Sequence, residues 1–240
     1  MLKVVFFDAA GTLIAPRAPV GATYARIAHA YGIDAAPDEV NAGFRRAFHA
    51  ALPLAFGPDH EAGELRRLEY QWWSDVVAKS FDGLGVFTNF DAYFRQLFVF
   101  FSDPSNWRID PMALSTLDQL RARGLKLGLV SNFDYRLYRI LSGLGLGAQF
   151  DSITISSEAG YAKPSPEIFR IAMRQHGVAS REVIHVGDAL ELDVAGALAA
   201  GITPLLLDPS APARTAIEGP TVRIATLDAI PEALDQLAFP

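Results

Sequence analysis

Two carboxylates and one amine in this chain stand where they could act together on an anion. Asp8 follows the apolar run VVFF, Asp188 follows VIHVG, and Lys163 lies in the segment AKPSPEIF. A carboxylate attacks an anionic phosphate readily only where cations cancel the repulsion, and a lysine with a bound divalent metal supplies that cancellation. These residue types therefore fit nucleophilic attack by a carboxylate within an anion-binding and metal-binding site.

Further polar residues stand beside these groups along the chain. Thr12 lies in the turn after the first apolar run, Ser131 and Asn132 end the run LGLV, and Asp193 lies five residues beyond the second acid. Each of these residue types often has a purely structural role as a turn former or helix cap. Together they indicate one site, because the carboxyl ends of parallel strands meet at one edge of a sheet.

Short apolar runs alternate with segments of helical periodicity and predict the elements that position these residues. Strands are expected at 2–7, 126–131, 152–156, 183–186 and 203–207, with a weaker one at 222–225. Helices are expected at 112–123, 135–144, 166–176 and 189–200, with a last one from 231. The alternation predicts an α/β core, a Rossmann-like parallel sheet with helices on both faces.

The segment from about residue 20 to 101 differs, because helical periodicity dominates it and no strand is expected there. Aromatic residues cluster in it, and Arg and Glu fill the positions between them, as on amphipathic helices. We expect an α-helical cap at 17–103, inserted into a core made of 1–16 and 104–240. Trp72 and Trp73 are expected to pack inside this helical bundle.

Composition narrows the possible functions. The net charge of −6 over 240 residues offers no electrostatic footprint for nucleic acid. The chain has no cysteine, which excludes disulfides, thiolate metal sites and a cysteine nucleophile. No run approaches the roughly 18 apolar residues of a membrane span, and the run before Asp8 is too short for a signal peptide. We expect a soluble, cytoplasmic protein that acts on a small molecule, with no membrane or nucleic-acid partner; the oligomeric state is left open.

Four segments resemble the ordered motifs of the haloacid dehalogenase (HAD) superfamily of hydrolases. They are FFDAAGTL, LVSN, the segment around Lys163-Pro164, and VGDALELDVAGA. A helical insert after the first motif is similar to the subfamily with a helical cap. The resemblance implies that Asp8 is a nucleophile that forms a covalent aspartyl intermediate. It implies that Lys163 neutralises Asp8 and the bound anion, while Ser131 and the backbone nearby hold the oxygens of the transferring group. Thr12 and Asn132 are further candidates to bind the substrate.

The same resemblance implies a magnesium site. Asp8, Asp188 and the backbone carbonyl of Ala10 would bind Mg²⁺, and Asp193 would support either the metal or Lys163. Mg²⁺ prefers a few carboxylates together with carbonyls and waters, which is the donor set expected at this edge. Arg17, soon after the first motif, is a further candidate to contact the anion, whereas His185 lies within a strand and is expected to be packed.

Ala10 departs from the pattern of most phosphatases in this superfamily. These enzymes have a second Asp two residues after the nucleophile, which protonates the leaving alkoxide and later deprotonates water. General acid–base catalysis contributes roughly 10² to 10⁴ in rate, so its loss decides which chemistry is credible.

Several functions remain open. One is an Mg²⁺-dependent phosphohydrolase that acts on good leaving groups or borrows an acid from the cap or the substrate. A second is a carbon–halogen hydrolase resembling the 2-haloacid dehalogenases, because halide leaves without a proton. A third is a protein that binds phosphorylated ligands, or regulates, with little turnover. Phosphonoacetaldehyde hydrolases also carry Ala there but need a cap lysine, which here could only be Lys79. We favour the phosphohydrolase, since clustered acids such as Asp188 repel one another unless a cation lies among them.

Overall fold

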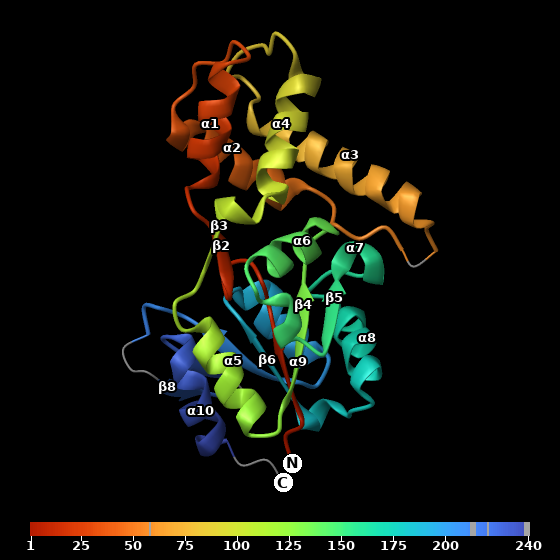
Figure 1. Cartoon of the computed structure of the whole chain (residues 1–240), viewed down its shortest axis with the longest axis vertical. Helices are drawn as coiled ribbons and strands as arrows, with labels where there is room; N and C mark the ends of the chain where they lie inside the picture. Colours follow the sequence, from red (N-terminus) through yellow and green to blue (C-terminus); the bar gives the residue numbers. More distant parts are fainter. Residues whose placement is uncertain (58, 212–214, 220, 238–240) are drawn as a thin grey trace.

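A computed structural model describes residues 1–57, 59–211, 215–219 and 221–237, which form an α/β core and a helical cap (Figure 1). The core contains a seven-stranded sheet in the order β5-β4-β1-β6-β7-β9-β8. Its strands are β1 (Val4–Phe7), β4 (Lys126–Ser131), β5 (Ser152–Ile155), β6 (Val183–Gly187), β7 (Thr203–Leu207), β8 (Thr215–Glu218) and β9 (Thr221–Ile224). All neighbouring strands are parallel except β8, which pairs antiparallel with β9. The predicted parallel α/β sheet is confirmed.

Helices cover both faces of this sheet. They are α5 (Ala113–Ala122), α6 (Arg136–Gly143), α7 (Ser156–Ala159), α8 (Pro166–His176), α9 (Ala195–Ala199) and α10 (Ile230–Gln236). In the central strand β1, Val5 and Phe7 pack into the cluster that contains α5, α6 and α10. Val4 and Phe6 pack on the opposite face, against α8 and α9. This two-sided burial explains the continuous apolar run before Asp8, since a strand covered on both faces has no solvent-facing side.

The cap consists of four helices inserted between the first strand and the rest of the core, as predicted. They are α1 (Val20–His29), α2 (Pro37–Ala50), α3 (Ala62–Ser80) and α4 (Phe90–Ser102). Their interior is strongly aromatic and is built around the fully buried Tyr93. The expectation for the tryptophans was wrong in part. Trp73 is only half-buried and reaches towards the core domain, while Trp72 donates from its indole to the carbonyl of Leu52.

Two short strands that were not predicted join the cap to the core. β2 (Ile14–Pro16) and β3 (Trp107–Ile109) pair antiparallel, with Ile14 opposite Ile109, and lie between the two domains (Figure 1). Three residues are too few to show alternation, so the sequence carries no periodic signal for them. This pair of strands places the segment where the chain enters the cap next to the segment where it leaves, beside the loop that follows β1.

The central strands bring their carboxyl ends to one edge. In the register of the sheet, Phe7 of β1 lies between Leu129 of β4 and Val186 of β6. The residues that follow these strands therefore meet at the edge that faces the cap. The helix predicted at 189–200 differs in its first turn, which is a π-helical turn at Leu190–Val194. No helix in the described part of the chain is long and apolar enough to cross a membrane.

Candidate active site

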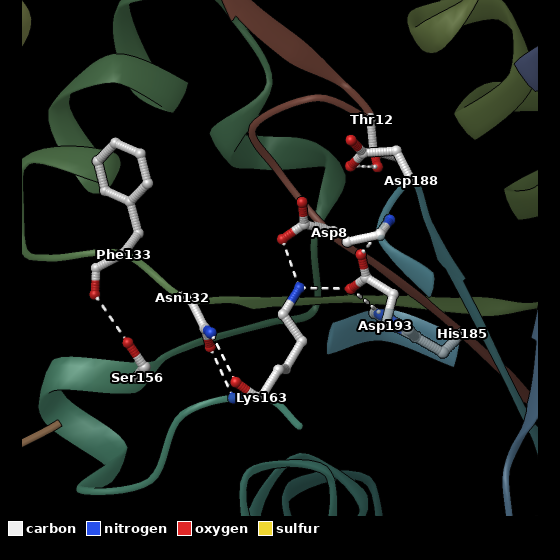
Figure 2. A network of polar contacts seen from close by, with 10 residues as sticks. Asp8, Thr12, Asn132, Phe133, Ser156, Lys163, His185, Asp188 and Asp193 are labelled. Carbon is white, nitrogen blue, oxygen red and sulfur yellow. Dashed lines mark hydrogen bonds and ion pairs between the residues drawn. The ribbon is translucent and has the colours of Figure 1, made fainter. Parts of the chain in front are cut away.

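A buried lysine joins two aspartates at this edge of the sheet (Figure 2). Lys163 Nζ lies 2.6 Å from Asp8 Oδ1 and 2.5 Å from Asp193 Oδ1, and all three side chains are buried. Burial opposes the charged ammonium, but the two carboxylates outweigh it and raise the pKa of Lys163. Burial also raises the pKa of Asp8, against the opposing pull of Lys163. The lysine therefore stays protonated and supplies the positive charge beside Asp8.

Asp193 is positioned from several directions. Its Oδ1 also lies 2.8 Å from His185 Nε2, and its Oδ2 accepts a hydrogen bond from the backbone N–H of Ala189. Burial would raise the pKa of Asp193, but Lys163 and His185 outweigh it and hold that pKa below its usual range. A Cβ atom on Gly187 would meet Asp193 Cγ at 2.2 Å, so the glycine makes room for the carboxylate.

His185 has the packed role predicted for it. Its ring is fully buried within β6 and packs against Phe169 at 4.9 Å between ring centroids. Burial lowers its pKa, so the imidazole is neutral at physiological pH and orients Asp193 through its hydrogen bond.

Asp188 lies on the other side of Asp8 and is more exposed. Thr12 Oγ1 donates to Asp188 Oδ1 at 3.1 Å, which places the predicted Thr12 against a carboxylate. Gly11 adopts φ of +101°, and a Cβ atom there would lie 2.4 Å from Asp188 Oδ2. A side chain at this position is excluded both by the backbone conformation and by the acid. Partial desolvation and the negative charges of Asp8 and Asp193 raise the pKa of Asp188 to about 6.

Asp8, Asp188 and Asp193 form a cluster that could hold a metal ion. One carboxylate oxygen from each lies within 4.8 Å of the others. Ionised, they carry three negative charges against the single positive charge of Lys163, which leaves two negative charges uncompensated. A divalent cation would balance them.

The available oxygens fit such an ion. Both oxygens of Asp193 accept protein hydrogen bonds, whereas among the described residues the second oxygens of Asp8 and Asp188 have no side-chain donor. Backbone hydrogen bonds in the first loop use the carbonyls of Ala9 and Ile14, and within the described chain none uses that of Ala10. These oxygens are therefore free to bind a metal ion, while the predicted ligand role of the Ala10 carbonyl and the supporting role of Asp193 stay predictions.

The segment after β4 positions the lysine. Asn132 Oδ1 accepts from the backbone N–H of Lys163 at 2.7 Å, and its Nδ2 donates to the Lys163 carbonyl at 2.9 Å. Ser131 is buried at the end of β4, one residue earlier. The structure thus brings both predicted residues to the site and assigns Asn132 a positioning contact that the sequence did not indicate. Direct contact of either with a substrate stays a prediction.

Arg17 lies apart from the other predicted residues. It is exposed and follows β2, and its Nε donates to the carbonyl of Ser105 at 2.8 Å. This hydrogen bond ties the two chain crossings between cap and core. Its predicted contact with the anion is still untested.

A cavity of about 360 Å³ lies between cap and core, above the nucleophile loop, the segment 8–13 that follows β1 and carries the predicted nucleophile Asp8. Its lining comprises Ala10, Gly11, Ala15, Pro16, Val20, Tyr24, Phe44, Phe48, Trp73, Val77, Phe94, Leu97, Phe98, Phe101, Trp107, Asn132, Phe133 and Arg136. Most of these side chains are apolar, and seven of them come from Phe, Trp or Tyr residues of the cap. The sequence gives no signal for this cavity, because its walls come from segments far apart in the chain.

Arg136 is the charged residue in this lining, and its charge is paired. Its Nε and Nη2 donate to Asp134 at 2.8 and 2.6 Å, and both side chains are buried. The guanidinium lies over the ring of Phe98, at 3.9 Å from its centroid, and 5.1 Å from that of Trp73. A charged pair directly after LVSNF was the one sequence signal for this feature.

Several hydrogen bonds connect the cap to the core near the cavity, and three of them join segments far apart in the sequence. Trp73 Nε1 donates to Asp134 Oδ2 at 2.6 Å, Ser156 Oγ donates to the Leu54 carbonyl at 2.6 Å, and the Tyr135 N–H donates to Glu69 Oε1 at 3.3 Å. The first two bonds have buried or half-buried partners. They stabilise the position of the cap over the cavity.

Known proteins are similar to this chain in sequence and in fold. A family model for haloacid dehalogenase-like hydrolases matches residues 2–201. The human haloacid dehalogenase-like hydrolase domain-containing protein 3 is 37% identical over 222 residues, which cover 87% of this chain and 85% of the human protein.

Two solved structures have the same architecture. The L-2-haloacid dehalogenase of Xanthobacter autotrophicus superposes with a TM-score of 0.73 at 19% identity and covers 99% of this chain and 100% of its own. The HAD-hydrolase YfnB of Bacillus subtilis, a structure bound to magnesium, has a TM-score of 0.72 at 17% identity and covers 98% and 99%. At these identities the likeness extends to the fold, including the inserted helical cap.

Proposed function

Because this chain belongs to the haloacid dehalogenase-like hydrolase family, we propose that it is an Mg²⁺-dependent phosphohydrolase with Asp8 as nucleophile. The observation that carries the proposal is the buried Lys163 amine between Asp8 and Asp193, beside a cluster of three aspartates. Such a site attracts an anionic group and lowers the repulsion between that group and the attacking carboxylate. A phosphate monoester is the substrate class that needs both properties.

Magnesium fits the donor set around Asp8. Carboxylates of Asp8 and Asp188 and the carbonyl of Ala10 are hard oxygen ligands of the kind Mg²⁺ prefers. When bound, Mg²⁺ supplies charge neutralisation at the phosphoryl oxygens. The structure of YfnB, a fold relative, contains magnesium, which agrees with this choice of metal.

The chain's own residues account for the reaction in two steps. In the first, a carboxylate oxygen of Asp8 forms a bond to phosphorus, and the bond between phosphorus and the leaving oxygen breaks. In the second, water attacks phosphorus, the acyl phosphate bond breaks, and inorganic phosphate leaves with Asp8 restored. Lys163 stays protonated throughout and compensates negative charge next to Asp8.

Ala10 limits which esters can react. It stands where the family resemblance places a second Asp, and its methyl group cannot transfer a proton. Among the described residues that line the cavity, none is Asp, Glu, His or Lys. We therefore expect substrates whose leaving group departs as a stable anion, as from an aryl or acyl phosphate.

Carbon–halogen hydrolysis is the second candidate, and the apolar cavity above Ala10 is the observation that favours it. Halide leaves without a proton, so the missing acid has no effect on that step. The acidic cluster weighs against this reaction, because a displacement at carbon has no need of a metal beside the nucleophile. A phospho-ligand-binding or regulatory protein with little turnover is the third.

A single panel separates these candidates. Phosphate release is measured from aryl, acyl and alkyl phosphates, and halide release from L-2-chloropropionate, each with Mg²⁺ or with EDTA. The proposal predicts phosphate release that needs Mg²⁺ and no halide. Halide release in EDTA would establish the second candidate, and binding of phosphate without turnover of any substrate would establish the third.

A further inference from the structure

The cavity above the nucleophile loop is large enough to hold a leaving group of one or two aromatic rings. It is lined by Ala10 and Gly11 of that loop and by Asn132, whose amide orients Lys163. Its volume is about 360 Å³. An apolar cavity of roughly 150 Å³ is known to accept benzene, so this one has room for about two fused rings.

Most polar side chains in the lining are already paired within the protein. Both amide atoms of Asn132 bond to the backbone of Lys163, and two nitrogens of Arg136 bond to Asp134. Burial raises the pKa of the remaining phenol, that of Tyr24, so it stays neutral. A leaving group with several hydroxyls would lose its hydration here and recover few hydrogen bonds.

The distribution of charge in the cavity also favours an apolar leaving group. The guanidinium of Arg136 is neutralised by the buried carboxylate of Asp134 and packs on the ring of Phe98. The walls therefore offer no uncompensated charge to an ionic leaving group, and burying an unpaired charge is costly. Aromatic walls instead favour a flat apolar group through area burial and ring packing.

The missing acid and the apolar walls are independent features that select the same chemistry. An aryloxide departs without prior protonation far more readily than an alkoxide, which suits a site without a proton donor. We infer that the leaving group is an aryloxide whose ring carries no other charge, so that the substrate class is the aryl phosphate monoester with one or two rings. This inference rests on the proposed phosphohydrolase function and specifies the group that is esterified to the phosphate.

The first test compares esters of similar leaving-group acidity in the presence of Mg²⁺. We expect kcat/KM for 2-naphthyl phosphate to exceed that for 4-carboxyphenyl phosphate by about tenfold or more, since the carboxylate must be desolvated. Acetyl phosphate, which is activated but small and not aromatic, tests the phosphohydrolase activity independently of the preference for an aromatic leaving group. Equal kcat/KM for the two aryl esters, with acetyl phosphate hydrolysed as well, would overturn the inference while the phosphohydrolase stands. No turnover of any of them would overturn the phosphohydrolase itself.

The second test places a negative charge in the cavity wall. Phe48 lines the cavity from α2 and is 37% exposed, so Phe48→Asp is compatible with folding, and Val86→Asp is the matched control at an 88% exposed position outside the lining. We expect Phe48→Asp to lower kcat/KM for 2-naphthyl phosphate about tenfold and to change that for acetyl phosphate less than about twofold. An equal loss for both esters, with the melting temperature unchanged, would contradict the inference.

A third measurement uses the unmodified protein and so does not depend on the folding of a variant. The product 2-naphthol carries the leaving group without phosphate, and glycerol is its polar counterpart. We expect 2-naphthol to inhibit competitively with respect to the aryl ester and glycerol to have no effect. Absence of inhibition by 2-naphthol up to its solubility limit would overturn the assignment of this cavity.

Discussion

The two sides of the candidate active site follow opposite physical rules. On the core side, Asp8, Lys163 and Asp193 form a buried chain of charges in which each group has an opposite charge within 2.6 Å. On the cap side, the cavity is walled by rings and aliphatic side chains, and Arg136 is neutralised by Asp134. One side is built for an anion and the other for an uncharged group.

We expect the charged side to determine which reaction takes place and the apolar side to determine which substrates are accepted. The charged side uses residues at the ends of neighbouring strands, whose positions follow from the sheet itself. The apolar side is assembled largely from the cap, where a change of one side chain should alter the shape of the cavity and leave Asp8 in place. Variants on the two sides should therefore have different kinetic signatures.

The largest effect is expected at the nucleophile. Asp8→Asn removes the attacking oxygen and should lower phosphate release by roughly 10⁴-fold or more. The control is Asp91→Asn, an exposed aspartate on α4. Turnover that persists in Asp8→Asn would show that another group attacks phosphorus.

Metal removal should have the next largest effect. Three aspartates against one lysine leave charge uncompensated, so EDTA should reduce phosphate release by roughly a hundredfold or more. Millimolar Mg²⁺ should also raise the melting temperature, because an ion that binds only the folded state stabilises it. Neither a thermal shift nor a change in rate would be compatible with a magnesium site here.

An acid introduced at position 10, where the charged and apolar sides of the site meet, should increase the turnover of alkyl phosphates. Ala10→Asp supplies a proton donor beside the leaving group and should raise turnover of alkyl phosphates by roughly 10²-fold, within the usual range of general acid catalysis. The same charge should weaken binding of an apolar ring, so the preference for aryl esters should fall. If alkyl phosphate turnover stays the same or falls, the missing acid is not what limits the reaction.

The smallest effect concerns Glu69, a buried carboxyl on α3 where the cap meets the core. Burial raises its pKa from 4.5 to about 7, and the negative charges of Asp134 and Glu158 add to the shift, whereas the Ser157 hydroxyl and the Tyr135 N–H oppose it. Between these pH values the folded protein binds more protons than the unfolded chain, so stability falls as pH rises through this window.

Glu69→Gln should abolish this loss. At pH 8 we expect its free energy of unfolding to exceed that of the unmodified protein by roughly 1–3 kcal/mol, with little difference near pH 4.5. Denaturant unfolding at the two pH values measures the effect, and Glu61→Gln is an exposed control just before the same helix. An equal difference at both pH values would indicate a packing effect and not a titration.

The charged side of the site could be predicted from the sequence, since its residues follow apolar runs of recognisable strand character. Asp8, Lys163, Asp188 and Asp193 come together as expected because the strand order places their loops side by side. The π-helical turn at Leu190–Val194 could not be predicted, because the contacts that Asp193 makes within it, to Lys163 and His185, leave no local sequence pattern.

The apolar side could be predicted only as a helical bundle. Periodicity identifies which faces of the cap helices are buried, but it does not say where the bundle docks on the core. The hydrogen bond from Trp73 to Asp134 spans 61 residues of sequence and leaves no local pattern. The same holds for the cavity, whose walls depend on how the four helices lie over the nucleophile loop.

The most direct test of the central claim is to trap the intermediate on Asp8. Without an acid–base group at Ala10, the attack of water should be slow, so the acyl phosphate should accumulate during turnover. Acid quenching after addition of an aryl ester labelled in its phosphoryl group should leave the label on the peptide that contains Asp8, and hydroxylamine should release it. Asp8→Asn should show no label. Phosphate release by the unmodified protein with no label on Asp8 would contradict the account.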